Sequence, residues 1–168
     1  MRENDKHTIT WLRALPLAFL LVQMLAACTS IDCPLNNLVK VNLMMKGESE
    51  TIPDTITITA IRTTGNDTIF NSGVNISNLA VPVSYTQDED RLQIALKDTL
   101  GNTYKDTLTI KKTNQIHFES VDCPPNYFHT LTDVSTTCHA IDSVVIKNPN
   151  IDYDHTKENI YIYFTPRN

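Results

Sequence analysis

Glycine is scarce in this 168-residue chain, which has only four, and its 14 lysines and arginines are outnumbered by 19 aspartates and glutamates. Four glycines are too few for the glycine-rich loops with which many enzymes cradle phosphate groups. The formal net charge of -5 disfavours a basic surface for nucleic acid. With 41% hydrophobic and 20% charged residues, the composition is that of a globular protein, and the length suits one domain.

The longest apolar run near the amino terminus is too short to cross a bilayer. Residues 1–13 are polar and carry three basic side chains, and the apolar run at 14–27 is 14 residues long. A membrane-spanning helix needs about 20 residues. A charged segment followed by a short apolar run is typical of an export signal, although a membrane helix or a buried helix is the alternative.

The end of this run is more specific than a general export signal. Leu25-Ala26-Ala27-Cys28 matches the pattern of a bacterial lipoprotein signal, in which cleavage occurs before a diacylated cysteine. We therefore expect residues 1–27 to be a signal peptide and Cys28 to carry the acyl chains that bind the membrane. Thr29 follows the cysteine in place of an inner-membrane retention aspartate. This favours an outer-membrane lipoprotein that faces the periplasm.

Three cysteines remain after lipidation, and export places them in an oxidising compartment. Cys33 and Cys123 occupy similar settings, because each follows an aspartate and precedes a proline. We predict a disulfide between them, with pairings of either one to Cys138 as the alternatives. The bond would close a loop of roughly 90 residues, worth about 4 kcal/mol in the chain-entropy model. The cysteine and histidine spacings are not those of a zinc site.

The body of the chain shows a period of two that is typical of strands. Aliphatic residues alternate with polar ones in 55–60, 92–96 and 107–110, and turn residues separate such stretches. We predict an all-β fold, a single antiparallel β-sandwich of immunoglobulin-like or related topology, over residues 36–168 after a lipidated tether at 28–35. Gly101-Asn102 predicts a hairpin, and Pro82 places its strand at an edge or a bulge. We expect 127–137 to be an irregular crossover.

An aspartate, a hydroxyl residue and an aliphatic residue recur together five times at irregular spacing. The hydroxyl residues are Thr55, Thr68, Thr99, Thr107 and Ser143. The pattern resembles the acceptor signal for protein O-glycosylation in exported proteins of Bacteroidetes-type bacteria, which makes these five residues candidate O-glycan acceptors. The alternative is a structural pattern in which the aspartate ends a turn and the hydroxyl residue begins a strand.

Several segments together resemble a known group of proteins. They are 28–37, 121–123, 128–134, 139–143 and 148–149. Over essentially the whole mature chain, they are similar to a family of uncharacterised Bacteroidetes lipoproteins that contain a domain of unknown function. The resemblance supports the lipid anchor and the bacterial setting, and it implies no activity.

Candidate catalytic and metal sites are weak in this sequence. His129, Asp133, Cys138 and His139 fall within eleven residues, which is the density of a Cys-His dyad or a metal site, but a histidine in such a threonine-rich segment more often stabilises a turn. Residues 148–158 alternate oxygen-bearing side chains as a calcium loop does, yet Tyr153 stands where such a loop has glycine. We therefore expect no enzyme activity, no metal and no cofactor.

Two tyrosines on the last predicted strand are candidates for a ligand-binding face. Tyr161 and Tyr163 alternate with aliphatic residues, so both point to one side of their sheet. Tyrosine rings stack on sugars and dock partners, although they also cover sheets without binding anything. We expect an interaction or structural subunit at the outer membrane with an envelope protein as partner; the alternative is a module that binds glycans or other ligands.

Overall fold

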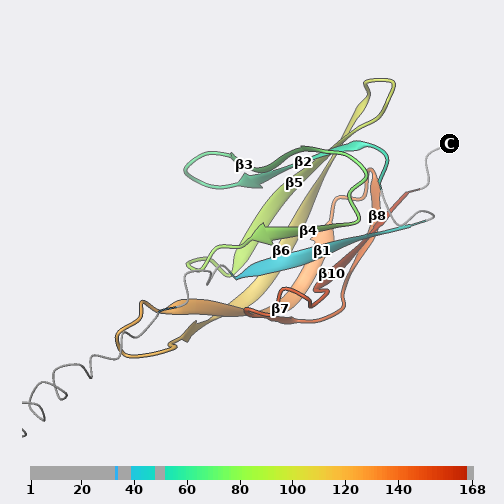
Figure 1. Ribbon diagram of the computed structural model, residues 1–168. Coiled ribbons are helices and arrows are strands. Elements are labelled where there is room, and N and C mark those ends of the chain that lie inside the picture. Colours follow the sequence, from blue (N-terminus) through green and yellow to red (C-terminus); the bar gives the residue numbers. More distant parts are fainter. Residues whose placement is uncertain (1–32, 34–38, 48–51, 166–168) are drawn as a thin grey trace, which may run out of the picture. The chain divides into compact units, whose positions relative to one another are not determined.

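The computed structural model describes Cys33 and residues 39–47 and 52–165, which Figure 1 shows as strands and connecting loops. This part of the chain contains no α-helix, and none of its segments is a helix long and apolar enough to cross a membrane. The predicted signal peptide and the predicted tether, apart from Cys33, lie outside the described residues.

Ten strands of the described residues form two sheets. The larger sheet contains, in spatial order, β3 (Asp67–Gly73), β2 (Thr55–Ile61), β5 (Glu89–Lys97), β6 (Thr103–His117), β7 (Asn126–Thr136) and β9 (Asn150–Ile151). The smaller sheet contains β4 (Asn78–Pro82), β1 (Lys40–Lys46), β10 (Ile160–Phe164) and β8 (Ile141–Ile146). Strand β1 runs parallel to β10, and the other pairs between these strands are antiparallel.

The hydrophobic core lies between the two sheets. In β2, Ile56 and Ile58 are fully buried while the threonines beside them are partly exposed. In β1, Val41 and Leu43 are fully buried in the same alternating way. The inward rows of both sheets belong to one cluster, and each buried aliphatic side chain stabilises the fold by about 1.5–3 kcal/mol. The predicted all-β sandwich is confirmed.

Strand β6 is 15 residues long and takes part in two hairpins. Its first part pairs with β5 and its second part with β7, so the two hairpin loops lie at opposite ends of β6 (Figure 1). In the β5–β6 turn Gly101 has a φ of 91°, which favours glycine, and the Asp98 carboxylate accepts a hydrogen bond from the Asn102 amide at 2.8 Å. The hairpin predicted at Gly101-Asn102 is confirmed.

Two further predictions concern individual strands. Strand β4, which ends at Pro82, is an edge strand of the smaller sheet, as predicted. The irregular crossover predicted at 127–137 is wrong, because β7 occupies most of this segment and pairs with β6 along its length. A register shift at Lys111 to Lys112 interrupts the pairing, and His129 takes an inward position. These two features weakened the period-two signal of β7.

Candidate functional site

A pocket of about 380 Å³ lies where the end of β4 faces the first half of β7. Its lining consists of Val39, Pro82, Val83, Tyr85, Pro125, Asn126, Tyr127 and His129. The volume falls within the range of small-molecule sites, and a mainly apolar wall with a few polar groups is their usual composition. Asn126 and His129 supply the polar groups here, together with the two tyrosine hydroxyls.

One wall of the pocket is a pair of stacked aromatic rings. Tyr85, in the loop after β4, and Tyr127, in β7, have ring centroids 5.2 Å apart and planes inclined by 28°. Tyr85 is 60% exposed, so its ring is available at the mouth of the pocket. Such rings combine flat apolar area with a polar tip, which suits contact with a ring-shaped ligand.

His129 is the buried polar residue of the pocket. Its side chain reaches Asn114 on the neighbouring strand, with 2.8 Å between Nδ1 and the Asn114 Oδ1 atom. Burial, and then the charge of Lys112, lower the pKa of His129 from 6.5 to about 4. The imidazole is therefore neutral at pH 7. Because Asn114 Oδ1 can only accept, Nδ1 carries the proton, and Nε2 is left as a hydrogen-bond acceptor.

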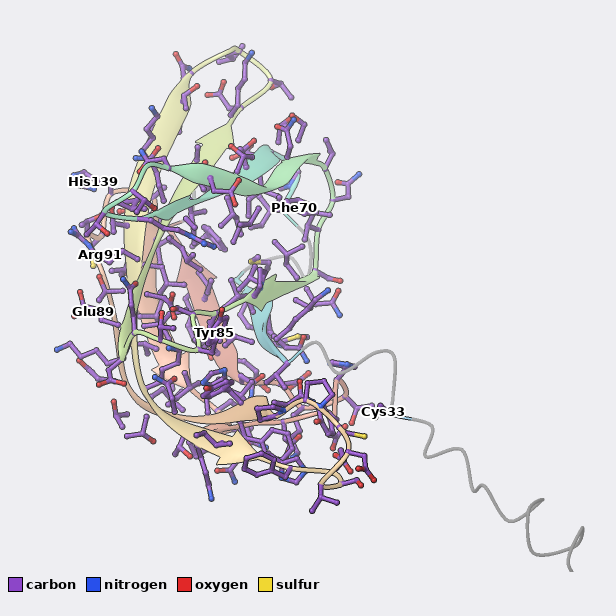
Figure 2. All side chains as sticks on the ribbon, turned by 90° about the vertical axis from the view of Figure 1, so that its left-hand side faces the viewer. Cys33, Phe70, Tyr85, Glu89, Arg91 and His139 are labelled. Carbon is purple, nitrogen blue, oxygen red and sulfur yellow. The ribbon has the colours of Figure 1, made fainter. Side chains whose placement is uncertain are left out.

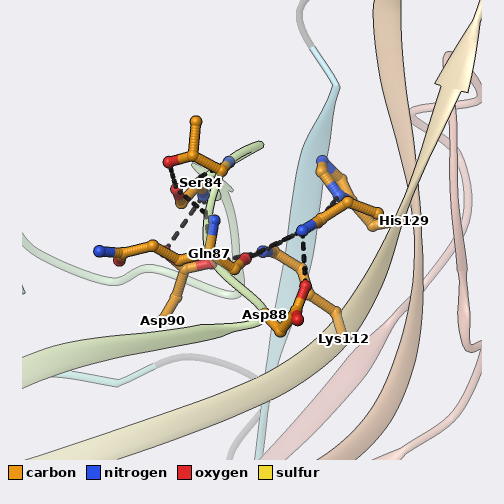
Figure 3. Close-up of polar contacts among 8 residues, drawn as sticks. Ser84, Gln87, Asp88, Asp90, Lys112 and His129 are labelled. Atoms are coloured by element: carbon orange, nitrogen blue, oxygen red, sulfur yellow. Dashed lines mark hydrogen bonds and ion pairs between the residues drawn. The ribbon is translucent and has the colours of Figure 1, made fainter.

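A network of polar side chains underlies the histidine, and Figure 3 shows its main bonds. The side chain of Lys112 is fully buried, and its Nζ atom lies 3.1 Å from Asp90 Oδ2 and 3.2 Å from Asn114 Oδ1. It also donates a hydrogen bond to the carbonyl oxygen of Gln87. Asn114 donates in turn to that same carbonyl and, at 2.9 Å, to Asp88 Oδ1. The buried ammonium is thus paired and surrounded by acceptors, as a buried charge requires.

The same network fixes the loop that carries Tyr85. Both carboxylate oxygens of Asp90 accept a hydrogen bond from the amide of Ser84, each at 3.1 Å. Ser84 is the residue before Tyr85, so the ion pair of Asp90 with Lys112 holds one wall of the pocket. Through Asn114 it also orients His129. The two sides of the pocket are therefore positioned by one buried cation.

Sequence reasoning missed Lys112, Asp90 and Asn114, although one signal was visible. In β6 every second residue from Asp106 to Lys112 is buried, with Leu108 and Ile110 between them. Two charged residues therefore occupy inward positions of an otherwise aliphatic row. A charge in such a row is buried and needs partners. The pattern therefore indicates a polar cluster around each end of the row, at Asp106 and at Lys112.

The pocket and its polar network lie mostly between residues 82 and 129. A family of unknown function, DUF6452, matches residues 55–164. The chain belongs to this family. The match confirms the predicted domain of unknown function, and it covers every pocket residue of this DUF6452 protein except Val39. No curated protein and no solved structure matches the chain.

The residues considered for a dyad or a metal site in this DUF6452 protein do not converge. His129 lines the pocket, whereas Asp133 pairs with Lys111 at 3.6 Å on the surface. Figure 2 shows His139 well apart from Tyr85 of the pocket. Cys138 is an exposed free thiol. Among the described residues, no group of three or more histidines, cysteines and acids is placed to hold a metal ion.

His139 belongs to a cluster around Asp106 instead. The buried Asp106 carboxylate accepts hydrogen bonds from the Thr137 hydroxyl at 2.6 Å and from the amides of His139, Ala140 and Ile141 at 2.6–2.9 Å. Burial raises the pKa of this carboxyl group, but these hydrogen bonds outweigh it and hold the pKa well below its usual value. Asp106 therefore ties β6 to the start of β8, and it is not among the residues that line the pocket.

Tyr161 and Tyr163 lie away from the pocket, on the outer face of the smaller sheet. Tyr161 donates a hydrogen bond to Glu158, and the Lys46 ammonium lies 4.8 Å from its ring centroid. Its neighbours in register are Met44 on β1 and Val145 on β8. Tyr163 is 37% exposed and Val145 48% exposed. The two tyrosines thus share a partly apolar sheet face, and neither of them lines the pocket at β4 and β7.

The five candidate O-glycan acceptors differ in exposure. Thr68 and Thr99 are exposed, and the other three, Thr55, Thr107 and Ser143, are half-buried. Thr99 stands in the β5–β6 turn beside Leu100, which is 87% exposed. Modification of these residues stays a prediction.

The cysteines have the oxidation states that the predicted pairing requires. Cys33 and Cys123 are both disulfide-bonded, while Cys138 is free. Cys28 lies outside the described residues.

The oxygen-bearing side chains of 148–158 are used within their own loop. Asn148 accepts a hydrogen bond from the Asn150 amide, and Asp152 accepts one from the Asp154 amide. Lys157 lies 2.5 Å from Asp152, so a cation of the protein already neutralises this carboxylate. The segment is therefore a series of turns that side chains stabilise.

Proposed function

We propose that this protein is a lipid-anchored, non-catalytic binding protein of a Bacteroidetes outer membrane, facing the periplasm. The lipoprotein signal pattern that ends at Cys28 supports the anchor. The disulfide-bonded Cys33 and Cys123 fit an oxidising compartment, where such bonds persist. The resemblance to Bacteroidetes lipoproteins supports the bacterial setting.

The pocket between the sheets carries the functional part of this proposal. We infer that it binds a sugar residue of a glycan, with the exposed side of the Tyr85 ring against the apolar face of the sugar and the Tyr127 ring stacked behind it. The neutral His129 offers Nε2 as an acceptor for a hydroxyl donor, and Asn126 adds an amide that can donate and accept. Stacking area with a few fixed polar groups is the combination that neutral, hydroxyl-rich rings require.

The same geometry favours binding over catalysis. Among the pocket-lining residues, only His129 and the two tyrosines can titrate. The partner of His129 is an amide oxygen and not a carboxylate, so nothing there stabilises an imidazolium. General base catalysis near neutral pH works best with a pKa close to the working pH, and that of His129 is about 4.

A glycan array of bacterial envelope oligosaccharides tests this function. We expect the mature protein to bind a subset of the array, and Tyr85→Ala to weaken that binding about tenfold, because one stacking ring is lost. Tyr85 is exposed in a loop, so the variant should fold. The matched control is Tyr163→Ala, which removes an exposed tyrosine from the outer face of the smaller sheet, away from the pocket, and should leave binding unchanged. Equal losses in both variants, or an array without binding, would contradict the proposal.

The outer face of the smaller sheet supports a second candidate function, an interaction subunit that docks an envelope protein. Val145 and Tyr163 are exposed large hydrophobic residues on neighbouring strands of this sheet. Partly apolar faces with tyrosines are common at protein interfaces.

Co-purification from gently solubilised native membranes tests this second function. We expect an envelope protein at near one-to-one stoichiometry, and we expect Val145→Asp to abolish its recovery. Recovery of the protein alone, under conditions that preserve known membrane complexes, argues against this role and leaves the pocket as the functional site.

A further inference from the structure

The loop that joins β6 to β7 exposes an unusual amount of apolar surface. Ile116 at the end of β6 is 53% exposed, and Phe118 and Val121 in the loop are 62% and 98% exposed. We call these three residues the apolar tip. At the other end of β6, the β5–β6 turn exposes one large apolar side chain, that of Leu100. Exposed apolar residues that gather on one loop mark a contact surface.

A disulfide-bonded cysteine in this loop bears on how far the loop can lie from the predicted lipid anchor. Cys123, in the same loop, and Cys33 are both disulfide-bonded, and the predicted pairing joins them. Cys33 follows the predicted acylation site, Cys28, by five residues, which span at most about 18 Å even when fully extended. With that predicted pairing and an acylated Cys28, the loop would be tied within a short distance of the membrane.

The charges around the tip indicate which kind of membrane contact is possible. Residues 113–126 contain two acids, Glu119 and Asp122, and no lysine or arginine, so this segment supplies no cation of that kind to attract anionic lipid headgroups. Glu119 is paired with His117 at 3.0 Å. Apolar side chains are stabilised when they are buried at the boundary between headgroups and acyl chains. This contribution does not require anionic lipids.

We propose that the apolar tip inserts into the membrane interface and orients the domain on the outer membrane. This inference rests on the lipid anchor of the proposed function, and it adds a second, non-covalent contact to the bilayer. Anchoring that uses two signals is more stable than either alone, and a second point of contact also restricts rotation. Because β6 is 15 residues long at about 3.4 Å per residue, it can separate the β5–β6 turn from the tip by at most about 50 Å.

Tryptophan fluorescence in vesicles tests this proposal directly. The one tryptophan of the chain is Trp11, in the predicted signal peptide, so Phe118→Trp gives a mature protein with a single tryptophan. The acylated variant is purified from bacterial membranes and reconstituted in phosphatidylcholine vesicles with and without brominated acyl chains. We expect a blue-shifted emission that loses most of its intensity in the brominated vesicles. High salt should not restore it.

The matched control is Leu100→Trp, at the other end of β6. It carries the same anchor, and we expect its emission to be unshifted and unquenched. Vesicle flotation is measured on both proteins, so that anchoring is read separately from insertion. If the Phe118→Trp protein floats with vesicles while its emission stays unquenched, the insertion alone is overturned, and the result points to a protein partner for the tip. A protein that fails to float overturns the anchor and, with it, this inference.

Discussion

The inward row of β6 has a buried charge at each end, and the two ends differ in what surrounds that charge. At one end Asp106 accepts hydrogen bonds from a hydroxyl and three backbone amides of a single connection. At the other end Lys112 is held by an acid, a backbone carbonyl and an amide side chain from separate segments. The first arrangement joins β6 to the start of β8. The second reaches His129 through Asn114, and His129 lines the pocket.

A buried charge therefore does not by itself identify a site. All the donors around Asp106 come from the segment 137–141, so the carboxylate acts as a local clamp. The partners of Lys112 come from β5, from the loop before it and from β6, and through Asn114 the network reaches β7. A charge that organises several segments beside a cavity is the better candidate for function.

The largest expected effect is that of Lys112→Ala. Removal of the ammonium leaves the Asp90 carboxylate, which is only 15% exposed, without its partner, and we expect a loss of about 3–5 kcal/mol in the free energy of unfolding. Urea denaturation measures it. The control is Lys111→Ala, whose exposed pair with Asp133 should be worth less than about 1 kcal/mol. Similar losses for adjacent lysines would show that Lys112 does not organise this end.

Asp106→Asn should have the next largest effect, about 3 kcal/mol at pH 7, because an amide group replaces an acceptor that serves several donors. The lowered pKa of Asp106 gives this effect a pH dependence. The ionised carboxylate stabilises the fold above its usual pKa of 3.8, and the contribution is lost as the pH falls towards the lower folded value. The gap between wild type and variant in urea denaturation should therefore narrow below about pH 3.8. A constant gap down to pH 2 contradicts this reading.

The titration of His129, which lies at the opposite end of β6, should change the free energy of unfolding over a different pH range. Its pKa falls from 6.5 in the unfolded chain to about 4 in the fold, so the unfolded state binds more protons between these values. Stability then falls as the pH is lowered from 6.5, by about 2 kcal/mol at pH 5. His129→Gln should lack this decline. Urea denaturation of both proteins at pH 7 and pH 5 measures it, and parallel declines would place the titration elsewhere.

The smallest effect is expected for His139→Ala. The side chain of His139 is 67% exposed, and its backbone amide, which bonds Asp106 at 2.8 Å, is retained in the variant. We expect a change below about 0.5 kcal/mol in urea denaturation at pH 7. A loss comparable to that of Asp106→Asn would show that the imidazole, and not the amides, holds the carboxylate.

Local patterns were sufficient for much of the fold. Period two in 55–60 and 92–96 predicted β2 and β5, because each strand has one buried face that the sequence records directly. Pro82 predicted an edge strand because proline cannot donate to a neighbouring strand. The period-two pattern did not predict β7, because its inward positions include the polar His129 and its pairing with β6 is irregular.

The pocket could not be predicted from local patterns. Tyr85 and Tyr127 stand 42 positions apart in sequence and meet only because the loop after β4 packs against β7. The tyrosines that the sequence singled out, Tyr161 and Tyr163, are readable as a pair because one strand carries both. Contacts across the sandwich leave no periodic signal, whereas contacts along one strand do. Lys112 is the exception, because its inward position is readable within β6.

The parallel pairing of β1 with β10 constrains the order in which the domain assembles. Leu43 pairs with Ile160, so strand β1 cannot form this pairing until a segment more than a hundred residues later in the chain is present. A chain delivered amino terminus first can form the β5–β6 and β6–β7 hairpins early, while the smaller sheet lacks one of its two central strands until β10 arrives. The sandwich is therefore complete only after the chain has emerged as far as β10, whether from a ribosome or from an export channel.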